Sequence, residues 1–290
     1  GVVIDGCPAG LSLSEEDIQV YLDRRKPGQS QFTTGRKESD MAQIWSGVFE
    51  GRTTGTPISI LVQNQDQRSR DYGNIMNTYR PGHADYTFDE KYGFRDYRGG
   101  GRSSGRETTA RVAAGAVAAK ILKELGIEVH AYTKAIGPVS VPENEYHPEE
   151  IFQNPIYMPS NAYAQKASAY LEECIKNQDS SGGIIECVVT GMPVGIGDTV
   201  FEKLDANLAK AMLSIGAVKG FEIGDGFKAA DTKGSINNDS FHTKDGRITK
   251  DTNHAGGVLG GMSDGSKIIF RAAVKPTPSI SQPQSTVTKD

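Results

Sequence analysis

Apolar residues recur at the three-to-four-residue spacing of a helix in four segments of the chain, which predicts four helices. The first begins after Ser14, where Asp17 three residues later is typical of a capped helix start. The others are expected at 104–126, 163–176 and 201–215. The second of these segments is so rich in alanine and glycine that neighbouring elements can approach it closely, and we expect it to be buried between layers.

Short β-rich runs lie between the predicted helices. Each is bounded by Gly, Pro or Asp, as strands commonly are, and the runs predict strands at 57–62, 183–190 and 267–274. The segment 142–160 is rich in Pro, Asn, Glu and Tyr and has no regular period. We interpret it as a surface excursion.

Two pairs of motifs recur in the same order along the chain. The pattern Gly-x-Pro-x-Gly followed by an aliphatic residue occurs at 6–11 and again at 191–196, each time before a predicted helix. Later, GVFEGRTTGTPISI at 47–60 aligns without a gap with GVLGGMSDGSKIIF at 257–270. The ordered matches indicate duplicated halves that pack as one unit, and chance similarity of glycine-rich turns is the alternative.

Composition restricts the class of protein. At 290 residues with 37% hydrophobic content the chain can bury a sizeable core, and it contains no apolar run that could span a bilayer. Three widely spaced cysteines without a CxxC pair favour neither a disulfide framework nor a zinc site, and a reducing cytoplasm fits them best. No HxH, HExxH or acidic cluster suggests a metal. A net charge of −4 argues against bulk attraction to nucleic acid or anionic lipid.

Positive charge is nevertheless dense in two places. Five arginines between Arg95 and Arg111 face only Asp96 and Glu107 within that stretch, and a second basic group lies at 24–37. Such patches in a mildly acidic protein suggest local recognition of an anionic ligand. A solvated charged face is the alternative interpretation.

The segment RDYRGGGRSSGRETTAR, 95–111, has the composition of a phosphate cradle. The glycines at 99–101 let the backbone approach a ligand, and an S-x-x-E capping box at Ser104 and Glu107 starts a helix whose free N–H groups point the same way. Three arginines add bidentate donors: Arg98, Arg102 and Arg106. The pattern is neither a Walker nor a Rossmann loop. An RNA-binding RGG tract is the alternative, but such tracts repeat and stay disordered.

Two further segments carry candidate chemistry. His83 lies in a Gly/Pro turn near the arginines, where a histidine can act as a neutral base or an acid near pH 7, although a structural role is the commoner one. His254, in a glycine-rich run, has the same ambiguity. In KPTPS, 275–279, two prolines fix the backbone while a lysine and two hydroxyls remain as donors for a phosphate or a ring carbonyl. A plain strand end is equally compatible with that motif.

Five motifs together, DRRKPGQS, RPGHADYT, DYRGGGRSSGRET, NHAGGVLGG and KPTPS, resemble the chorismate synthase family in order and spacing across nearly the whole chain. The resemblance implies an α+β fold, a β-α-β sandwich with helices between antiparallel sheets and internal pseudo-duplication. It also implies a single domain over 1–290, assembled as a cytoplasmic homotetramer.

The reaction that the resemblance implies is an anti-1,4-elimination in the shikimate pathway, which converts 5-enolpyruvylshikimate 3-phosphate into chorismate and phosphate. The implied cofactor is reduced flavin mononucleotide (FMN), which lends an electron and receives it back, with NADPH as the candidate reductant. The partner is then a small molecule, and neither nucleic acid nor a membrane is expected.

The resemblance also assigns residues. His83 corresponds to a catalytic histidine that serves the reduced flavin. The flavin contacts are Arg102, Ser103, Ser104, Gly216, Ala217, Gly260, Lys275, Pro276, Thr277, Pro278 and Ser279. The contacts with substrate or NADP anions are Arg25, Gln31, Arg36 and Arg106. The family usually has arginine where this chain has Gln31, so that anion contact is expected to be weaker or replaced by Arg36.

Two segments of the family pattern lie outside the 290 residues. One is the family's opening segment, which has a Gly-Glu-Ser-His motif with a catalytic histidine, and the other is its closing segment, which has an Arg, a His and an Asp near the flavin. We therefore expect the chain as written to lack part of the proton-transfer machinery. A flavin-binding or phosphate-binding module without catalysis is the alternative function.

Overall fold

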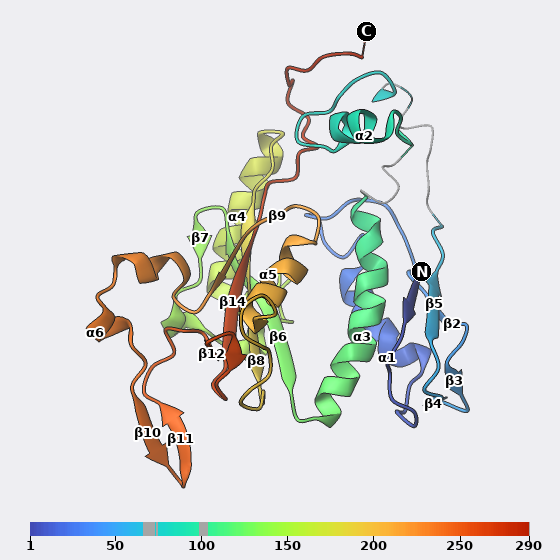
Figure 1. Cartoon of the computed structure of the whole chain (residues 1–290). Coiled ribbons are helices and arrows are strands. Elements are labelled where there is room, and N and C mark those ends of the chain that lie inside the picture. The colour runs from blue at the N-terminus through green and yellow to red at the C-terminus, as the bar shows by residue number, and fades with distance from the viewer. Residues whose placement is uncertain (66–72, 74, 99–103, 290) are drawn as a thin grey trace. The chain divides into compact units, whose positions relative to one another are not determined.

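The computed structural model describes residues 1–65, 73, 75–98 and 104–289. The chain forms two compact units, which are described separately (Figure 1). Unit 1 comprises Gly1–Ile121 with Ser281–Asp290, and unit 2 comprises Leu122–Ile280. Among the described residues, no helix has both the length and the apolar character needed to cross a membrane.

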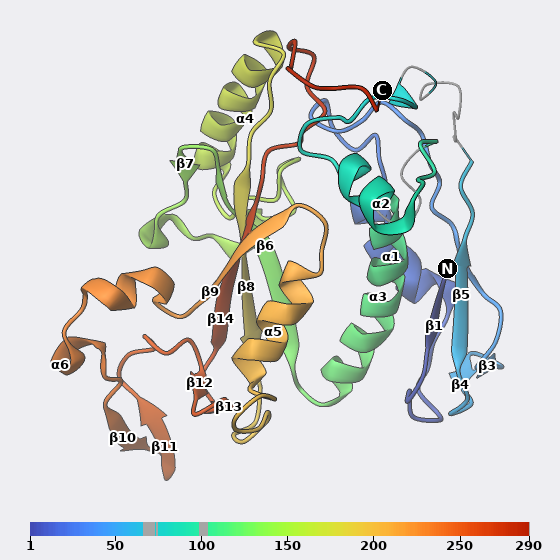
Figure 2. The same cartoon turned by 45° about the horizontal axis from the view of Figure 1, so that its top comes forward.

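Unit 1 is built on a three-stranded antiparallel sheet in the order β1-β5-β2. Its strands are β1 (Val2–Ile4), β2 (Ala42–Ile44) and β5 (Ile58–Val62). Its helices are α1 (Glu15–Arg25), α2 (Asp85–Tyr92) and all but the last turn of α3 (Thr108–Glu124). Helices α1 and α3 lie on the same side of the sheet in both views (Figures 1 and 2). Their apolar residues form one core with the sheet: Cys7, Leu13, Ile18, Leu22, Ala42, Ile58, Ile60, Ala113, Ala116 and Val117.

Helix α1 begins as the sequence predicts. The backbone N–H of Ser14 donates to Asp17 Oδ2 at 2.9 Å, which satisfies a donor at the helix start. Ile18 and Leu22, four residues apart, are fully buried on its inner face. The helix ends just before Pro27, because the residue preceding a proline disfavours the helical conformation.

Helix α3 confirms part of what its sequence predicts. Ser104 Oγ accepts from the backbone N–H of Arg106 at 3.2 Å and caps a 3-10 turn, Gly105–Glu107, that leads into the helix. Glu107 does not complete the capping box. Its carboxylate instead accepts from Arg111 Nε at 2.9 Å, because the neighbouring turn offers a charged donor. Within unit 1 the helix buries one stripe, so burial on all sides is not seen there.

Unit 2 has a five-stranded antiparallel sheet in the order β7-β6-β8-β14-β9. The strands are β6 (Glu128–Ile136), β7 (Val139–Ser140), β8 (Gly183–Thr190), β9 (Val218–Ile223) and β14 (Ile268–Val274). The helices are α4 (Asn161–Lys176), α5 (Leu204–Leu213) and the short α6 (Gly234–Asn237). Leu204, Leu208 and Met212 of α5 pack on one face of the sheet, against a core that includes Cys187 and Phe270.

Short hairpins and 3-10 turns complete the two units. The hairpins are β3 (Val48–Phe49) with β4 (Arg52–Thr53), β10 (Phe241–Lys244) with β11 (Arg247–Lys250), and β12 (Val258–Leu259) with β13 (Met262–Ser263). The remaining 3-10 turns are η4 (Glu143–Glu145), η5 (Pro148–Glu150) and η6 (Gly226–Asp231). The predicted mixed α+β class with antiparallel sheets is confirmed.

The segment 142–160 is irregular, as predicted, and its first part, 143–149, lies mostly at the surface, but the interpretation as a surface excursion is wrong for its second part. Met158 is fully buried and Ile151 is 5% exposed. Asn154 makes this burial possible, because its amide donates to the carbonyls of Glu150 and Met158 and its carbonyl accepts from the Met158 N–H. The side chain thus replaces the backbone partners that a helix or strand would supply.

The duplicated motifs lie in a repeated arrangement of elements. In unit 1 the chain runs β1, α1, β2, the β3-β4 hairpin and β5. In unit 2 it runs β8, α5, β9, the β12-β13 hairpin and β14, with η6, α6 and the β10-β11 hairpin inserted after β9. The first, last and middle strands of these runs pair in the same order, β1-β5-β2 and β8-β14-β9. The repeat is therefore a strand-helix-strand-hairpin-strand element.

Hydrogen bonds repeat as well. Thr53 Oγ1 donates to Pro8 O at 2.6 Å and accepts from the Leu11 N–H at 3.0 Å. In unit 2 the equivalent hydroxyl of Ser263 donates to Pro193 O at 2.5 Å and accepts from the Ile196 N–H at 2.8 Å. In each unit one buried hydroxyl ties the Gly-x-Pro-x-Gly turn to a hairpin.

A matched set of substitutions tests this bridge. Thr53→Val keeps the shape but leaves the carbonyl of Pro8 and the N–H of Leu11 without that partner, so we expect the free energy of unfolding to fall by about 1–3 kcal/mol. Urea denaturation measures the loss. Thr54→Val, one residue on and exposed, is expected to change stability by less than about 0.5 kcal/mol. Equal effects of the two substitutions would contradict the bridge.

Candidate functional site

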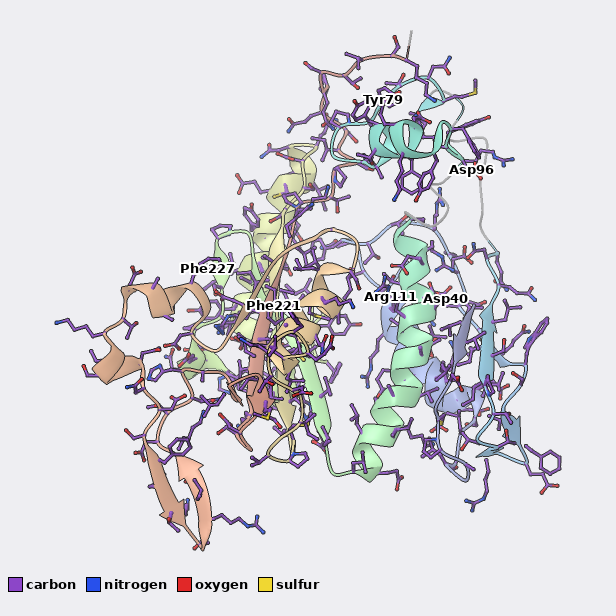
Figure 3. All side chains as sticks on the ribbon, in the orientation of Figure 1. Asp40, Tyr79, Asp96, Arg111, Phe221 and Phe227 are labelled. Carbon is purple, nitrogen blue, oxygen red and sulfur yellow. The ribbon has the colours of Figure 1, made fainter. Side chains whose placement is uncertain are left out.

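Two arginine side chains from distant parts of unit 1 meet at Asp40. The Asp40 carboxylate is fully buried and accepts two bonds from Arg106, Nη1 to Oδ2 at 3.0 Å and Nη2 to Oδ1 at 2.7 Å. Arg25 Nη1 lies 3.4 Å from the same Oδ2. Figure 3 shows Asp40 beside helix α3. Two guanidinium groups share one carboxylate, so a positive charge is left in excess here.

Arg25 also fixes the start of α3. Its Nη2 donates to Gly105 O at 3.0 Å and to Thr108 Oγ1 at 3.0 Å. Burial lowers the pKa of Arg25, and the positive charge of Arg106 lowers it further, while Asp40 acts in the opposite direction. An arginine pKa is high enough that the group remains charged at neutral pH. The sequence predictions for Arg25, Arg106 and Ser104 therefore fall at one place in the fold.

A cavity of about 320 Å³ lies beside this cluster. It is lined by Gly1, Ile60, Val62, Asn64, Arg106, Glu107, Thr109, Ala110 and Ala113. Within the described part of the chain, two buried polar atoms of lining residues have no hydrogen-bond partner, Arg106 Nε and Thr109 Oγ1. Both can donate, so the cavity has donors for the oxygen of a carboxylate or a phosphate.

The arginines between 95 and 111 are paired more fully than the sequence predicts. Arg98 Nε lies 3.0 Å from Asp96 Oδ1, and both side chains are more than half exposed. Arg111 is paired with Glu107, and Arg106 with Asp40. The excess of arginine within 95–111 is therefore reduced in the fold, because Asp40 and Asp89 from outside that stretch pair with Arg106 and Arg95.

Arg95 is the clearest case of a structural arginine. Its side chain is 5% exposed and its Nη2 donates to the carbonyls of Ile75 at 2.8 Å and Thr78 at 2.9 Å. Its Nη1 pairs with Asp89, and Lys289 from the C-terminal segment lies 2.7 Å from the same carboxylate. These bonds hold the loop before α2, the helix and the C-terminal segment together.

The central part of the predicted phosphate cradle lies outside the described residues. This applies to the glycines at 99–101 and to Arg102 and Ser103. Ser104 is described and acts as a helix cap. Convergence of Arg98, Arg102 and Arg106 on one ligand therefore stays a prediction, with Arg98 and Arg106 already engaged by Asp96 and Asp40.

His83 lies in the turn before α2. Its Nδ1 is 3.0 Å from Pro81 O, and its backbone N–H donates to Arg80 O at 3.2 Å. A carbonyl only accepts, so Nδ1 carries the proton and Nε2 holds the basic lone pair of the neutral ring. The side chain is half-buried. Its catalytic role stays a prediction.

Gln31 and Arg36 belong to the irregular stretch between α1 and Asp40. Gln31 is exposed and Arg36 is half-buried. Glu38 ties this stretch to the segment that follows β5, because its Oε2 accepts from the Gln65 N–H at 2.8 Å. Anion binding by Gln31 or Arg36 stays a prediction.

Unit 2 brings two of the predicted flavin segments together. The backbone N–H of Lys275 donates to Ala217 O at 2.9 Å, so the 216–217 turn and the KPTPS loop are adjacent. Ala217 has φ +72°, an uncommon left-handed conformation for a non-glycine residue. Ser180 Oγ donates to Thr277 O at 2.7 Å and fixes the loop further.

Gly260 is not part of that group. It lies between β12 and β13, before β14 begins, whereas Lys275 follows the end of β14. Seven residues of extended strand separate the two ends by about 20 Å. Gly260 and Lys275 are therefore not neighbours within unit 2. Contact of Gly260 with the flavin stays a prediction.

A buried cluster that the sequence did not reveal fixes the run 252–257. Lys250 Nζ, 2% exposed, lies 3.2 Å from Asp239 and 2.6 Å from Asp264. Asp239 also accepts from the backbone N–H groups of His254 at 2.7 Å and Ala255 at 3.0 Å. Burial alone would raise the pKa of Asp239, but the hydrogen bonds from Thr252, these N–H groups and Lys250 outweigh it and lower the pKa.

A second missed feature is a polar ladder across the sheet of unit 2. Tyr132, Glu186, Arg271 and Glu222 are cross-strand neighbours on β6, β8, β14 and β9. Arg271 pairs with Glu186 at 2.9 Å and Glu222 at 2.6 Å, and the Tyr132 hydroxyl donates to Glu186. Charged residues inside otherwise apolar strands were a signal for it.

The cysteines offer little chemistry. All three, Cys7, Cys174 and Cys187, are free. Burial, followed by the negative charge of Glu186, raises the pKa of Cys187 to about 12, so its thiol stays protonated at neutral pH. In the described part of the chain, no group of three or more His, Cys, Asp or Glu side chains is placed to hold a metal ion.

The cluster at Asp239 gives a pH prediction. A carboxylate whose folded pKa is lowered stabilises the fold above its unfolded pKa, about 3.9, and loses that contribution as pH falls through the folded value. We expect amide exchange protection at 252–257 to hold at pH 7 and to fall below about pH 4. Asp239→Asn should lower protection at pH 7 and remove this dependence. Asp245→Asn, in the exposed β10-β11 turn, should change neither, and equal behaviour of the two variants would contradict the assignment.

Comparisons with known proteins agree with the resemblance in the sequence. A family model described as chorismate synthase matches residues 1–290. Chorismate synthases of Agathobacter rectalis and Methanocella arvoryzae are 65% and 55% identical to this chain, over 100% and 99% of it and 79% and 78% of the relatives. A crystal structure titled as chorismate synthase superposes with a TM-score of 0.79 at 33% identity, covering 94% of this chain and 79% of that one.

Proposed function

The chain belongs to the chorismate synthase family, and we propose that it uses reduced FMN to convert 5-enolpyruvylshikimate 3-phosphate into chorismate and phosphate. The reaction is an anti-1,4-elimination by a carbon-oxygen lyase in aromatic amino acid biosynthesis. The observation that carries this proposal is the match over the whole chain together with the two arginines held at one buried carboxylate.

The proposed substrate site is the cluster at Asp40 with its cavity. The substrate carries a phosphate and two carboxylates, so it needs concentrated positive charge and hydrogen-bond donors. Arg25 and Arg106 supply the charge in excess of Asp40, and Thr109 Oγ1 supplies a buried donor. As phosphate departs, guanidinium groups that are already oriented stabilise the negative charge that develops on it. We propose Gln31 and Arg36 as further anion contacts.

The proposed cofactor site draws on the predicted flavin segments. In unit 2 the 216–217 turn lies against the KPTPS loop, whose lysine and two hydroxyls form a donor set that fits the phosphate and carbonyl oxygens of a flavin. Arg102, Ser103, Ser104 and Gly260 complete the proposed contacts. When bound, reduced flavin supplies an electron as phosphate leaves and regains it as hydrogen is lost, so there is no net redox change.

His83 is proposed to hold and move a proton beside the reduced cofactor. The support is its tautomer: with Nδ1–H donating to Pro81 O, the proton-accepting atom of the ring is Nε2. We further propose NADPH as the reductant, assembly as a homotetramer, a cytoplasmic location that fits the free cysteines, and 1–290 as one functional domain.

A turnover assay tests the function. The purified full-length protein, incubated anaerobically with reduced FMN and 5-enolpyruvylshikimate 3-phosphate, is expected to form chorismate and phosphate in equal amounts, detected by chromatography. Reactions without the reductant should form neither, because the cofactor acts only when reduced. Flavin binding without product would instead indicate a binding protein and would refute the proposed reaction.

A second experiment tests the flavin contact at Arg102. Arg102→Ala is expected to weaken FMN binding by about 1–3 kcal/mol, the usual loss for a charge-assisted hydrogen bond, measured by fluorescence titration. Arg247→Ala, which removes an exposed arginine of the β10-β11 hairpin outside the proposed contacts, should leave the dissociation constant unchanged. An unchanged constant for Arg102→Ala would place the phosphate contact elsewhere.

A further inference from the structure

The contacts of Arg106 fix the direction of its guanidinium group. Nη1 and Nη2 form a two-pronged pair with the Asp40 carboxylate, and Nη2 also donates to Asn64 Oδ1 at 2.9 Å. Because the guanidinium group is planar, these three bonds determine its plane. Arg106 Nε is buried without a partner among the described residues, and Arg106 and Asn64 both line the cavity beside Thr109.

Asp40 is itself held independently of the arginines. Gln19 Nε2 donates to Asp40 O at 3.3 Å, and Gln19 Oε1 accepts from the Ala42 N–H at 3.0 Å, so α1 anchors the backbone on both sides of Met41. Asp40 has φ +47°, in the left-handed region that aspartate and asparagine tolerate better than most residues. The carboxylate is thus a fixed point to which the two longer, flexible side chains are attached.

We propose that Asp40 is a positioning residue, which aims Arg106 and Arg25 at the anion of the substrate without touching it. The inference rests on the proposed function and names a residue that the sequence motifs did not. Without the carboxylate, two flexible guanidinium groups would repel each other and lose rotamer entropy on binding. A shared buried carboxylate removes both penalties before the substrate arrives.

A positioning role and a purely electrostatic role of Asp40 predict opposite changes in anion affinity when the carboxylate is neutralised. If Asp40 only reduced the local positive charge, its neutralisation would raise that charge and tighten anion binding. If Asp40 positions the arginines, neutralisation should weaken binding, because Arg106 loses its two-pronged partner. A merely structural residue would lower the melting temperature and leave the affinity of the folded protein unchanged.

Asp40→Asn is the informative variant, because asparagine keeps the size and suits the left-handed backbone. Calorimetric titration of the complex with oxidised FMN should show the dissociation constant of 5-enolpyruvylshikimate 3-phosphate rising about 10-fold to 100-fold. KM should rise by a similar factor and kcat should change less. Tighter binding, unchanged binding, or a fall confined to kcat would each overturn the proposal.

Ser39→Ala is the matched control. Ser39 precedes Asp40, and its hydroxyl is buried with no hydrogen-bond partner in the described part of the protein, so its removal should leave the dissociation constant unchanged. Wild-type protein that neither binds nor converts the substrate would refute the proposed function itself. Normal wild-type activity with an unaltered Asp40→Asn variant would refute only the positioning role.

Arg106→Lys keeps the proposal testable if Asp40→Asn does not fold. Lysine preserves the charge beside Asp40 but has no planar fork, so the dissociation constant should again rise about 10-fold or more. Where both single variants fold, the dissociation constant of the double variant should rise by less than the product of the two single-variant factors, because both substitutions remove the same interaction. Independent, multiplicative effects would overturn the coupling.

Discussion

A buried carboxylate is tolerated only when charged or hydrogen-bonding partners compensate for its lost hydration, and that constraint organises unit 1. Asp40 is fully buried, and its partners come from α1 and from the turn before α3. Satisfying one charge therefore fixes two helices relative to the sheet of this unit. It also leaves the guanidinium group of Arg106 at a cavity whose lining residues include buried donors without a partner in the described part of the chain.

The repeated element explains how glycine-rich segments become well defined. In each unit a buried hydroxyl, of Thr53 or of Ser263, bonds both the carbonyl and an N–H of a Gly-x-Pro-x-Gly turn. Gly47 and Gly257 have φ +79° and +84°, and a side chain at either would meet a carbonyl oxygen at 2.7 or 2.5 Å. The close approach of the strand that follows requires glycine at both positions. Glycine therefore recurs at equivalent positions in the two halves.

Unit 2 uses buried polar clusters to hold the segments that carry its candidate chemistry. Lys250 with Asp239 fixes the run that contains His254, and the backbone bond from Lys275 to Ala217 joins two segments of the proposed flavin site. Such contacts fix backbone positions before a ligand binds, which reduces the entropy that binding would otherwise lose. The loops are irregular in conformation but determined by specific bonds.

The sequence by itself determined the local elements and the repeat. Helices after Ser14 and Ser104, the strand at 183–190 and the paired motifs follow from periodicity, caps and glycine spacing, all of which act over a few residues. The family was evident from motif order. The roles of Arg102 and Ser103, which lie outside the described residues, and those of His83 and Gly260 stay predictions.

What only the tertiary structure decided is which charges meet. Glu107 pairs with Arg111 rather than completing a capping box, and Arg95 is occupied by carbonyls and by Asp89. Asp40 carried no local signal, because an aspartate in a polar run looks the same whether it will be exposed or buried. Coulomb interactions depend on distance in space, and residues 25, 40 and 106 become neighbours only when the chain folds.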